Sequence, residues 1–308
     1  MHLLIPFASA LSEAATHVLR DLALPQLAQL LARLTPVQRD DAEPTSLSPP
    51  HERAWAAAVG WQGDDGCLPF AAHAAAADGI DVGDAAWGLV TPCHWLVGRE
   101  HVTLLDPAAL NLGEAESRAA FAAVRALFES EGFRLEWGAP LRWYAAHERL
   151  RALPCAALDR VIGRNVEPWL AGTTDTLLRR LQSELQLLLY PHALNEAREQ
   201  RGELSLNSIW LSGCGAHQSV RGAPPLCNDT LRAPLLADDW VAWAQAWRTL
   251  DDGHIADCLA AVRAGRPGSL TLCGERGAHR FEPVPQGLWQ RVARRWQTSE
   301  PHTVLEAL

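Results

Sequence analysis

The sequence contains no lysine, and all 27 of its basic residues are arginine. No reaction step can therefore use a lysine ammonium group or a lysine Schiff base. The formal net charge of -9 argues against a general nucleic-acid-binding surface, although a local basic pocket is compatible with it. No apolar run approaches the length of a membrane span. We therefore expect neither a nucleic acid nor a membrane as a partner.

The cysteines form no CxxC pair, which argues against a zinc site. They are also odd in number and scattered, which argues against a disulfide framework. The N-terminal residues carry no basic segment, so we expect no signal peptide. We therefore expect reduced, mostly structural thiols in a cytoplasmic protein. The seven cysteines are Cys67, Cys93, Cys155, Cys214, Cys227, Cys258 and Cys273.

The chain contains both strand-like and helix-like segments. We predict strands at 2–8, 101–106, 133–137, 207–211 and 269–273, and loops at 35–50 and 216–234. We predict helices at 13–34 (in two pieces, with Pro25 in the first turn of the second), 70–77, 112–131, 238–250 and 286–296, and one capped by Thr174 or Asp175. The tryptophans of 238–250 share one helix face, which is typical of a core or dimer contact.

The segment 191–215 combines a short polar helix, a strand and a turn with glycines at Gly213 and Gly215. A strand that ends in flexible residues can present backbone N–H groups to an anion. In open α/β sheets, ligands bind at such carboxyl ends. An ordinary loop after a buried strand fits the spacing equally well, because GxG alone is a weak signal.

The wider pattern of this segment resembles the archaeal-type cofactor-independent phosphoglycerate mutases, which belong to the alkaline phosphatase superfamily. That family carries His-Pro-Val-Asn, then Arg, Gly and Ala-Asn-x-Ile-Trp-Leu-Trp-Gly-x-Gly. This chain keeps the frame and has Ser212 in place of the second Trp. The matching residues are His192, Asn195, Arg198, Gly202, Asn207, Ile209, Trp210, Gly213 and Gly215.

The resemblance implies a three-layer αβα sandwich of alkaline-phosphatase type with an inserted α+β cap domain. We expect residues 1–54 and 191–308 to form the phosphatase-like core, and 55–190 to form the cap with its connecting helix. The resemblance also places ligand contacts at His192, Asn195, Arg198 and Asn207. Arg142 is the nearest basic candidate for a further anion contact. Arg198 could equally be a solvated helix charge.

The family's two-metal centre is degenerate in this sequence. The first strand ends in Pro6-Phe7 where the family has Asp-Gly, and the nucleophilic Ser aligns with His51. The Asp-His metal pair has become Glu275-Arg276. Asp251 and His254 faintly match an Asp-x-x-Gly-His motif, and His279 keeps its place. A compact dication site that loses ligands should lose its metal.

Three functions fit these observations. The first is a non-catalytic binding or regulatory protein for a small phosphorylated or carboxylate ligand, with no cofactor. The second is an active phosphoglycerate mutase or related phosphotransferase with relocated ligands. It would hold Mn or Zn through Asp251, His254, Glu275 and His279, with His51 as phosphoryl carrier. The third is a structural partner-binding protein. A homo-oligomer is compatible with each.

Overall fold

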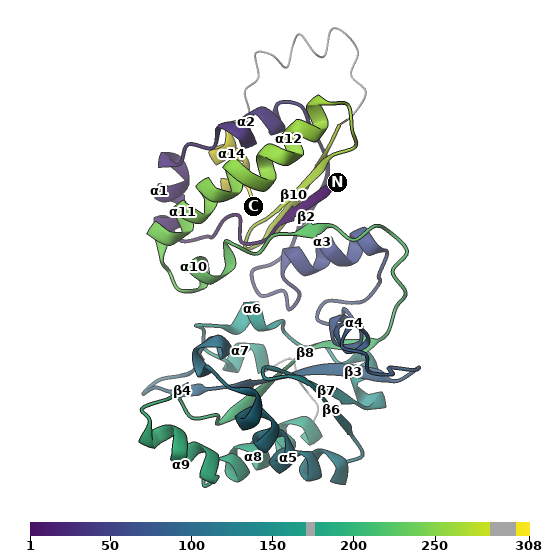
Figure 1. Ribbon diagram of the computed structural model, residues 1–308, viewed down its shortest axis with the longest axis vertical. Coiled ribbons are helices and arrows are strands. Elements are labelled where there is room, and N and C mark those ends of the chain that lie inside the picture. Colours follow the sequence, from purple (N-terminus) through teal and green to yellow (C-terminus); the bar gives the residue numbers. More distant parts are fainter. Residues whose placement is uncertain (171–175, 284–299) are drawn as a thin grey trace. The chain divides into compact units, whose positions relative to one another are not determined.

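The structure is a computed structural model that describes residues 1–170, 176–283 and 300–308 (Figure 1). Two compact units make up the chain, and each is described by itself. Unit 1 comprises Met1–Thr45, Pro49–Gly60 and Val220–Leu308, and unit 2 comprises Ser46–Ser48 and Trp61–Ser219. The helix predicted at 286–296 and the cap predicted at Thr174 or Asp175 lie outside the described residues.

The unit boundary differs from the predicted core and cap domains. Residues 191–219 belong to unit 2, although the sequence places 191–308 in the core. The reason is β8 (Ser208–Ala216), which pairs along its length with β3 (Ala86–Cys93) in the unit 2 sheet. Residues 55–60 belong to unit 1, because α3 (Pro50–Val59) runs through the predicted boundary at residue 55.

Unit 1 is built on a mixed five-stranded sheet with the order β2-β11-β10-β1-β9. Strand β1 is parallel to both of its neighbours, β10 and β9, whereas β11 is antiparallel to β10 and β2. The three parallel strands β10, β1 and β9 therefore end together at one end of the sheet, which we call its carboxyl edge. The strands are β1 (His2–Ile5), β2 (Thr35–Asp41), β9 (Leu226–Cys227), β10 (Ser269–Cys273) and β11 (Gly277–Glu282).

Helices cover both faces of this sheet. On one face, Leu3 and Ile5 pack with the apolar sides of α1, α2, α11, α12 and α14. On the other face, Leu4 packs with Ala54 and Trp55 of α3. Alternate residues of β1 thus serve opposite layers, as strand geometry requires. The remaining helices are α1 (Glu13–Asp21), α2 (Pro25–Leu31), α10 (Arg232–Leu236), α11 (Trp240–Leu250), α12 (Ala256–Arg263) and α14 (Pro301–Glu306), with a π-turn at Asp251–Ile255.

Two predictions for unit 1 have clear outcomes. Trp243 and Trp247 of α11 are fully buried in the core, which confirms the core interpretation of that aromatic helix face. The predicted loop 35–50 is wrong over its first half, because β2 pairs with β11 there. Most of the β2 side chains are exposed, and Pro36 interrupts the pattern. An edge strand tolerates both features, so hydrophobic alternation does not reveal it.

Unit 2 contains an antiparallel four-stranded sheet with the order β6-β7-β3-β8 and a separate β4-β5 hairpin. Its main core lies between this sheet and α5 and α8, with Trp143, Phe121 and Leu185 among the buried side chains. Here α4 packs on β3 and β8 with small alanines. The strands are β4 (Trp95–Val97), β5 (Val102–Leu104), β6 (Arg134–Ala139) and β7 (Arg142–Ala146), besides β3 and β8.

One helix of unit 2 has a leucine pattern that predicts a core-facing stripe, at Leu177, Leu178, Leu181, Leu185 and Leu188. Leu181 and Leu185 of α8 are buried, and the other three leucines are partly buried against the same core, which confirms the stripe as core. The α-helices are α4 (Phe70–Ala77), α5 (Glu114–Ser130), α6 (Leu158–Val161), α7 (Glu167–Leu170), α8 (Thr176–Leu189) and α9 (Ala193–Gln200), and the 3-10 turns are η1 (Pro107–Leu110) and η2 (Glu148–Ala152).

Among the helices of the described ranges, none combines the length and apolar character that a membrane crossing requires. All seven cysteines are free thiols, and the Sγ atoms of Cys155 and Cys214 lie 3.6 Å apart in the interior of unit 2.

The first strand of unit 1 generates a prediction about pH. His2 Nε2 lies 2.8 Å from Thr271 Oγ1, and burial, followed by the charge of Arg280, lowers the pKa of His2 from 6.5 to about 4. Between these pH values the unfolded chain binds a proton that the folded chain does not. Protons therefore favour unfolding, and we expect stability to fall as the pH drops from 6.5 to 4.

The measurement is the urea midpoint across that pH range for the wild type, for His2→Gln and for His17→Gln. His2→Gln should flatten the slope, whereas His17, which is exposed on α1, should leave it unchanged. An unaltered slope in His2→Gln would contradict the assignment.

Candidate functional site

The unit 1 sheet has a carboxyl edge, and ligands of α/β sheets bind at such edges. The strands β1, β9 and β10 end at this edge, and the chain continues from them into Phe7, Asn228 and Gly274. The N-terminus of α3 brings His51 to the same edge, because its ring centroid lies 5.1 Å from that of Phe7. The structure therefore brings the end of the first strand beside His51.

Phe7 occupies an unusual backbone position. Its φ is +58°, in the left-handed region that glycine adopts without cost and bulky residues rarely adopt. Such a conformation costs about 1–3 kcal/mol and persists only where its surroundings hold it. Two contacts do so here: the ring packs on His51, and the carbonyl oxygen accepts a hydrogen bond from Trp243 Nε1 at 3.2 Å. An aromatic ring thus fills the space beside His51.

The turn after β10 is also closed by protein atoms. One carboxylate oxygen of Glu275 accepts a hydrogen bond from the backbone N–H of Leu11 at 3.0 Å. A Cβ placed on Gly274 would lie 2.4 Å from Ser9 Oγ and 2.5 Å from Leu308 Cβ, so this glycine is required by close packing. The Leu308 carbonyl accepts from the backbone N–H of Gly277 at 2.8 Å.

The other predicted metal ligands serve separate roles. Asp251 is buried and accepts from the backbone N–H groups of Gln26 (3.0 Å) and Leu27 (2.7 Å), so it caps α2. Burial raises the pKa of Asp251. His254 is exposed, with Nδ1 at 3.1 Å from Asn228 Nδ2.

His279 lies buried on β11. Its Nε2 is 4.0 Å from the exposed Asp41, and burial lowers the pKa of His279. Within residues 1–170, 176–283 and 300–308, no three His, Cys, Asp or Glu side chains are arranged to hold a metal ion.

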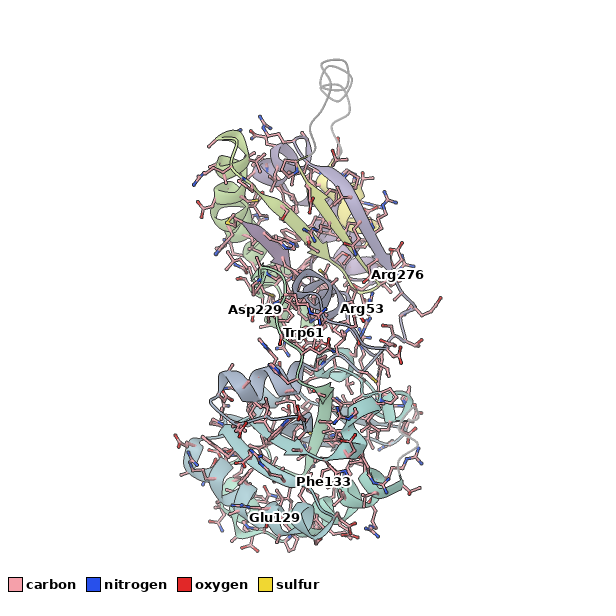
Figure 2. The ribbon with its side chains drawn as sticks, turned by 90° about the vertical axis from the view of Figure 1, so that its right-hand side faces the viewer. Arg53, Trp61, Glu129, Phe133, Asp229 and Arg276 are labelled. Carbon is pink, nitrogen blue, oxygen red and sulfur yellow. The ribbon has the colours of Figure 1, made fainter. Side chains whose placement is uncertain are left out.

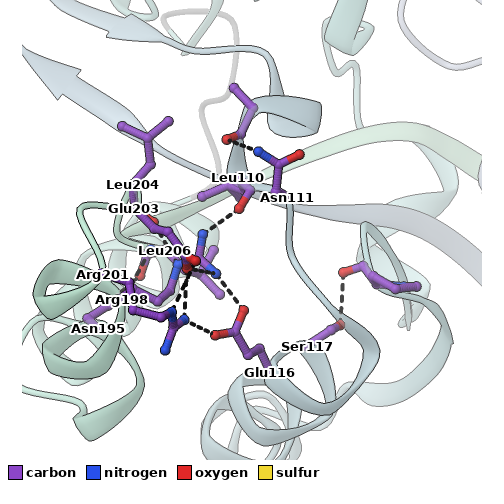
Figure 3. Close-up of polar contacts among 12 residues, drawn as sticks. Leu110, Asn111, Glu116, Ser117, Asn195, Arg198, Arg201, Glu203, Leu204 and Leu206 are labelled. Atoms are coloured by element: carbon purple, nitrogen blue, oxygen red, sulfur yellow. Dashed lines mark hydrogen bonds and ion pairs between the residues drawn. The ribbon is translucent and has the colours of Figure 1, made fainter.

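The predicted ligand contacts of α9 form a structural cluster in unit 2 (Figure 3). Arg198 is fully buried. Its Nε donates to the Leu204 carbonyl at 2.7 Å, its Nη1 to Glu116 Oε2 at 2.5 Å, and its Nη2 to the Leu110 carbonyl. Arg201 also binds Glu116 from the exposed side. Every nitrogen of the Arg198 guanidinium thus has an acceptor from the protein.

The two asparagines that were predicted as ligand contacts form hydrogen bonds with backbone groups. Asn195 Nδ2 donates to the carbonyls of Leu189 and Leu206, and Asn195 Oδ1 accepts from the Leu206 N–H at 2.8 Å. Asn207 brackets Trp95 in the same manner, since its Oδ1 accepts from the Trp95 N–H at 2.7 Å and its Nδ2 donates to the Trp95 carbonyl at 2.9 Å. Both amides hold segments of unit 2 in register.

His192 and Arg142 also bind protein groups. His192 Nδ1 accepts from the Leu194 N–H at 3.2 Å and caps α9. Arg142 pairs with both carboxylate oxygens of Asp78 at 2.7 and 2.8 Å, and Tyr144 donates its hydroxyl to the same carboxylate. Arg142 holds the pKa of Asp78 below its usual range. These contacts do not support an anion pocket at either residue.

The predicted glycine turn is wrong, because β8 continues through Gly213 and Gly215 to Ala216. Gly213 has φ +62°, and a Cβ there would lie 3.0 Å from the Ala71 backbone nitrogen. The glycine therefore allows α4 to approach the strand closely. The segment 191–215 supplies α9 and β8 of unit 2.

Unit 2 contains a cavity of about 480 Å³ that the sequence does not predict. Its walls come from α5, α7, α8, β7 and β8, together with the residues around 155. We call it the aromatic cavity after the rings that line it, which include Phe133, a residue labelled in Figure 2. These rings are Trp95, Phe128, Phe133, Trp169 and Trp210. They lie far apart in the sequence, so no local pattern brings them together.

Another hollow lies on the α3 face of the unit 1 sheet. It measures about 270 Å³ and is lined by Arg39, Arg53 and Arg280 among others. Arg53 is engaged there, with Nε at 2.8 Å from Asp40 and Nη2 at 3.3 Å from the carbonyl oxygen of Arg276. Figure 2 labels Arg53 and Arg276. Arg280 pairs with Glu282 at 2.5 Å.

Comparison with known proteins gives a distant likeness of fold. No protein-family model matches the sequence, and no curated protein matches it. A cofactor-independent phosphoglycerate mutase from Thermoplasma acidophilum is similar at 12% identity, over 99% of this chain and 98% of that one, with a TM-score of 0.37. The PH0037 protein of Pyrococcus horikoshii is similar at 12% identity, over 91% and 86%, with a TM-score of 0.43.

The Arg198 cluster generates a stability prediction. Arg198→Met should destabilise unit 2 by about 3–5 kcal/mol, because it leaves two buried carbonyls and part of Glu116 without a donor. Arg201→Met, which removes an exposed partner of the same carboxylate, should cost at most about 1 kcal/mol. Urea denaturation of both variants measures the difference. Equal, small losses would show that Arg198 is not a structural residue.

Proposed function

We propose that this protein is a phosphoglycerate-mutase-like α/β protein that has lost its two-metal centre and acts by binding a ligand. The observation that carries the proposal is the ring of Phe7 packed on His51 at the carboxyl edge of the unit 1 sheet. In the resembling family, these two positions belong to a metal-binding Asp-Gly and to the nucleophilic serine. Here an apolar ring and an imidazole occupy them.

The chemistry of phosphoryl transfer supports this proposal. An in-line displacement of this kind needs two cations about 4 Å apart, held by several carboxylates and imidazoles. The cations neutralise charge that develops on the phosphoryl oxygens. In this chain Asp251 caps a helix, Glu275 binds the backbone of Leu11, and His279 lies beside Asp41. The absence of lysine removes another cation that could stabilise the phosphoryl group.

The left-handed backbone at Phe7 is a further support. The family has glycine at this position, and glycine is the residue that such a backbone favours. A strand end that keeps this conformation while bearing a phenyl ring is consistent with descent from the glycine-containing turn. We therefore propose a non-catalytic member of that lineage, without a resident metal.

The experiment measures metal content and turnover on the same preparation. The protein is purified in the presence of manganese, analysed for Mn and Zn, and assayed with 2- and 3-phosphoglycerate. We expect less than stoichiometric metal and no turnover. An active cofactor-independent mutase in the same assay is the positive control.

Stoichiometric Mn or Zn together with turnover would overturn the proposal in favour of a working mutase with relocated ligands. His51→Gln should then abolish the activity if His51 carries the phosphoryl group. Phe7→Ala is the matched variant, since it removes the adjacent ring and leaves the imidazole in place.

A further inference from the structure

The aromatic cavity has walls that accept apolar atoms and offer few polar partners. Gln182 Nε2 donates to the Ile209 carbonyl at 3.3 Å, and Gln186 Nε2 donates to Ser208 Oγ at 3.2 Å. The indole N–H of Trp210 donates to the Ala156 carbonyl at 2.9 Å. These donors already bind protein groups, whereas Trp95 Nε1 is buried without a hydrogen-bond partner in the part of the chain that the structure describes. A polar ligand group with several acceptors placed deep in the cavity would therefore lose most of its hydrogen bonds to water without replacement.

The charged groups of the cavity lie at its rim. Arg179 and Glu167 both line it, and both are exposed. Neither side chain has an ion pair with a residue in the part of the chain that the structure describes. Arg179 differs in this respect from its neighbour Arg180, which pairs with Glu131 and Glu184.

The rim favours an anion over a cation. Arg179 belongs to the first turn of α8, and the first turn of a helix carries positive partial charge that stabilises anions. An arginine can also lay its apolar stem along the cavity wall while its guanidinium reaches solvent. The carboxylate of Glu167 repels an anion, so removing its charge tests whether the ligand carries a negative charge at the rim.

We infer that the aromatic cavity of unit 2 binds an amphiphilic carboxylate, with its apolar body among the rings and its acid group beside Arg179 at the rim. The cavity volume of about 480 Å³ lies within the range of small-molecule sites. It could hold about 16 water molecules at the roughly 30 Å³ that each occupies in the liquid. A medium-chain fatty acid or an aryl-substituted acid fits this space.

A small phosphorylated acid fits the same cavity poorly, because its several oxygens would face aromatic rings. The inference does not depend on whether unit 1 is catalytic, because every residue used for it belongs to unit 2. A protein with an active metal centre could hold the same ligand.

Titration calorimetry with dodecanoate, below its micelle concentration, tests the site directly. Dodecanol and dodecyltrimethylammonium share the apolar tail and replace the acid by a neutral or a cationic head, and decanoate shortens the tail. Of the three compounds with a dodecyl tail, we expect dodecanoate to bind most tightly. We expect decanoate to bind about fifteenfold more weakly, because each buried methylene contributes about a fourfold change in affinity.

Matched pairs of variants locate the ligand. Arg179→Gln should weaken dodecanoate binding about three- to fivefold, the effect of losing one exposed ion pair, and should leave dodecanol unchanged. Arg180→Gln should change neither ligand, and Glu167→Gln should strengthen dodecanoate binding. Ser183→Trp at the rim should abolish binding of both, whereas Glu184→Trp on the next exposed position should not.

The placement of the acid group beside Arg179 would be wrong if the cationic amphiphile bound more tightly than dodecanoate. It would also be wrong if Arg179→Gln and Arg180→Gln weakened dodecanoate binding equally. Absence of binding to the wild type, or equal affinities in the two tryptophan variants, would overturn the cavity as the site. Circular dichroism on each variant confirms that the compared proteins are folded.

Discussion

A guanidinium group that has no access to water must find an acceptor for its donors inside the protein, and this constraint governs unit 2. Arg198 meets it with the Glu116 carboxylate and with backbone carbonyls such as that of Leu204, so α5 and the chain after α9 are fixed against each other. Asn195 and Asn207 extend the same principle, because each amide binds both a donor and an acceptor of the backbone. These bonds fix the start of β8, and β8 in turn forms one wall of the aromatic cavity.

The same constraint explains why sequence reasoning misjudged this segment. Asparagine and arginine are chosen for ligand sites because they carry several directional donors and acceptors. A buried backbone needs the same groups for the same reason. Residue type and spacing therefore cannot distinguish a ligand contact from a backbone clasp, and only the placement of Glu116 and Trp95, which are distant in sequence, separates them.

Local patterns predicted what local forces determine. Pro25 begins α2, the leucine stripe of α8 is buried, and the tryptophans of α11 face the core, because each depends on helix geometry within a few residues. The sequence could not predict β2, which is held by its partner strand while most of its side chains face solvent. It could not predict the role of Gly213 either, since the close approach of Ala71 is a tertiary contact. The rings of the aromatic cavity are likewise brought together by tertiary contacts, which the sequence could not predict.

The two units offer different means of holding a ligand. At the carboxyl edge of the unit 1 sheet, Phe7 has a strained left-handed backbone, and its ring packs on that of His51, so an apolar contact lies there. Binding of a metal there would require removal of the ring as well as new ligands, because a cation beside a phenyl ring has no oxygen donors. At the site that we propose in unit 2, the cavity would recognise shape and apolar surface, and Arg179 at the rim would orient the ligand. Binding of that kind needs no metal, so it does not depend on the chemistry at the carboxyl edge of unit 1.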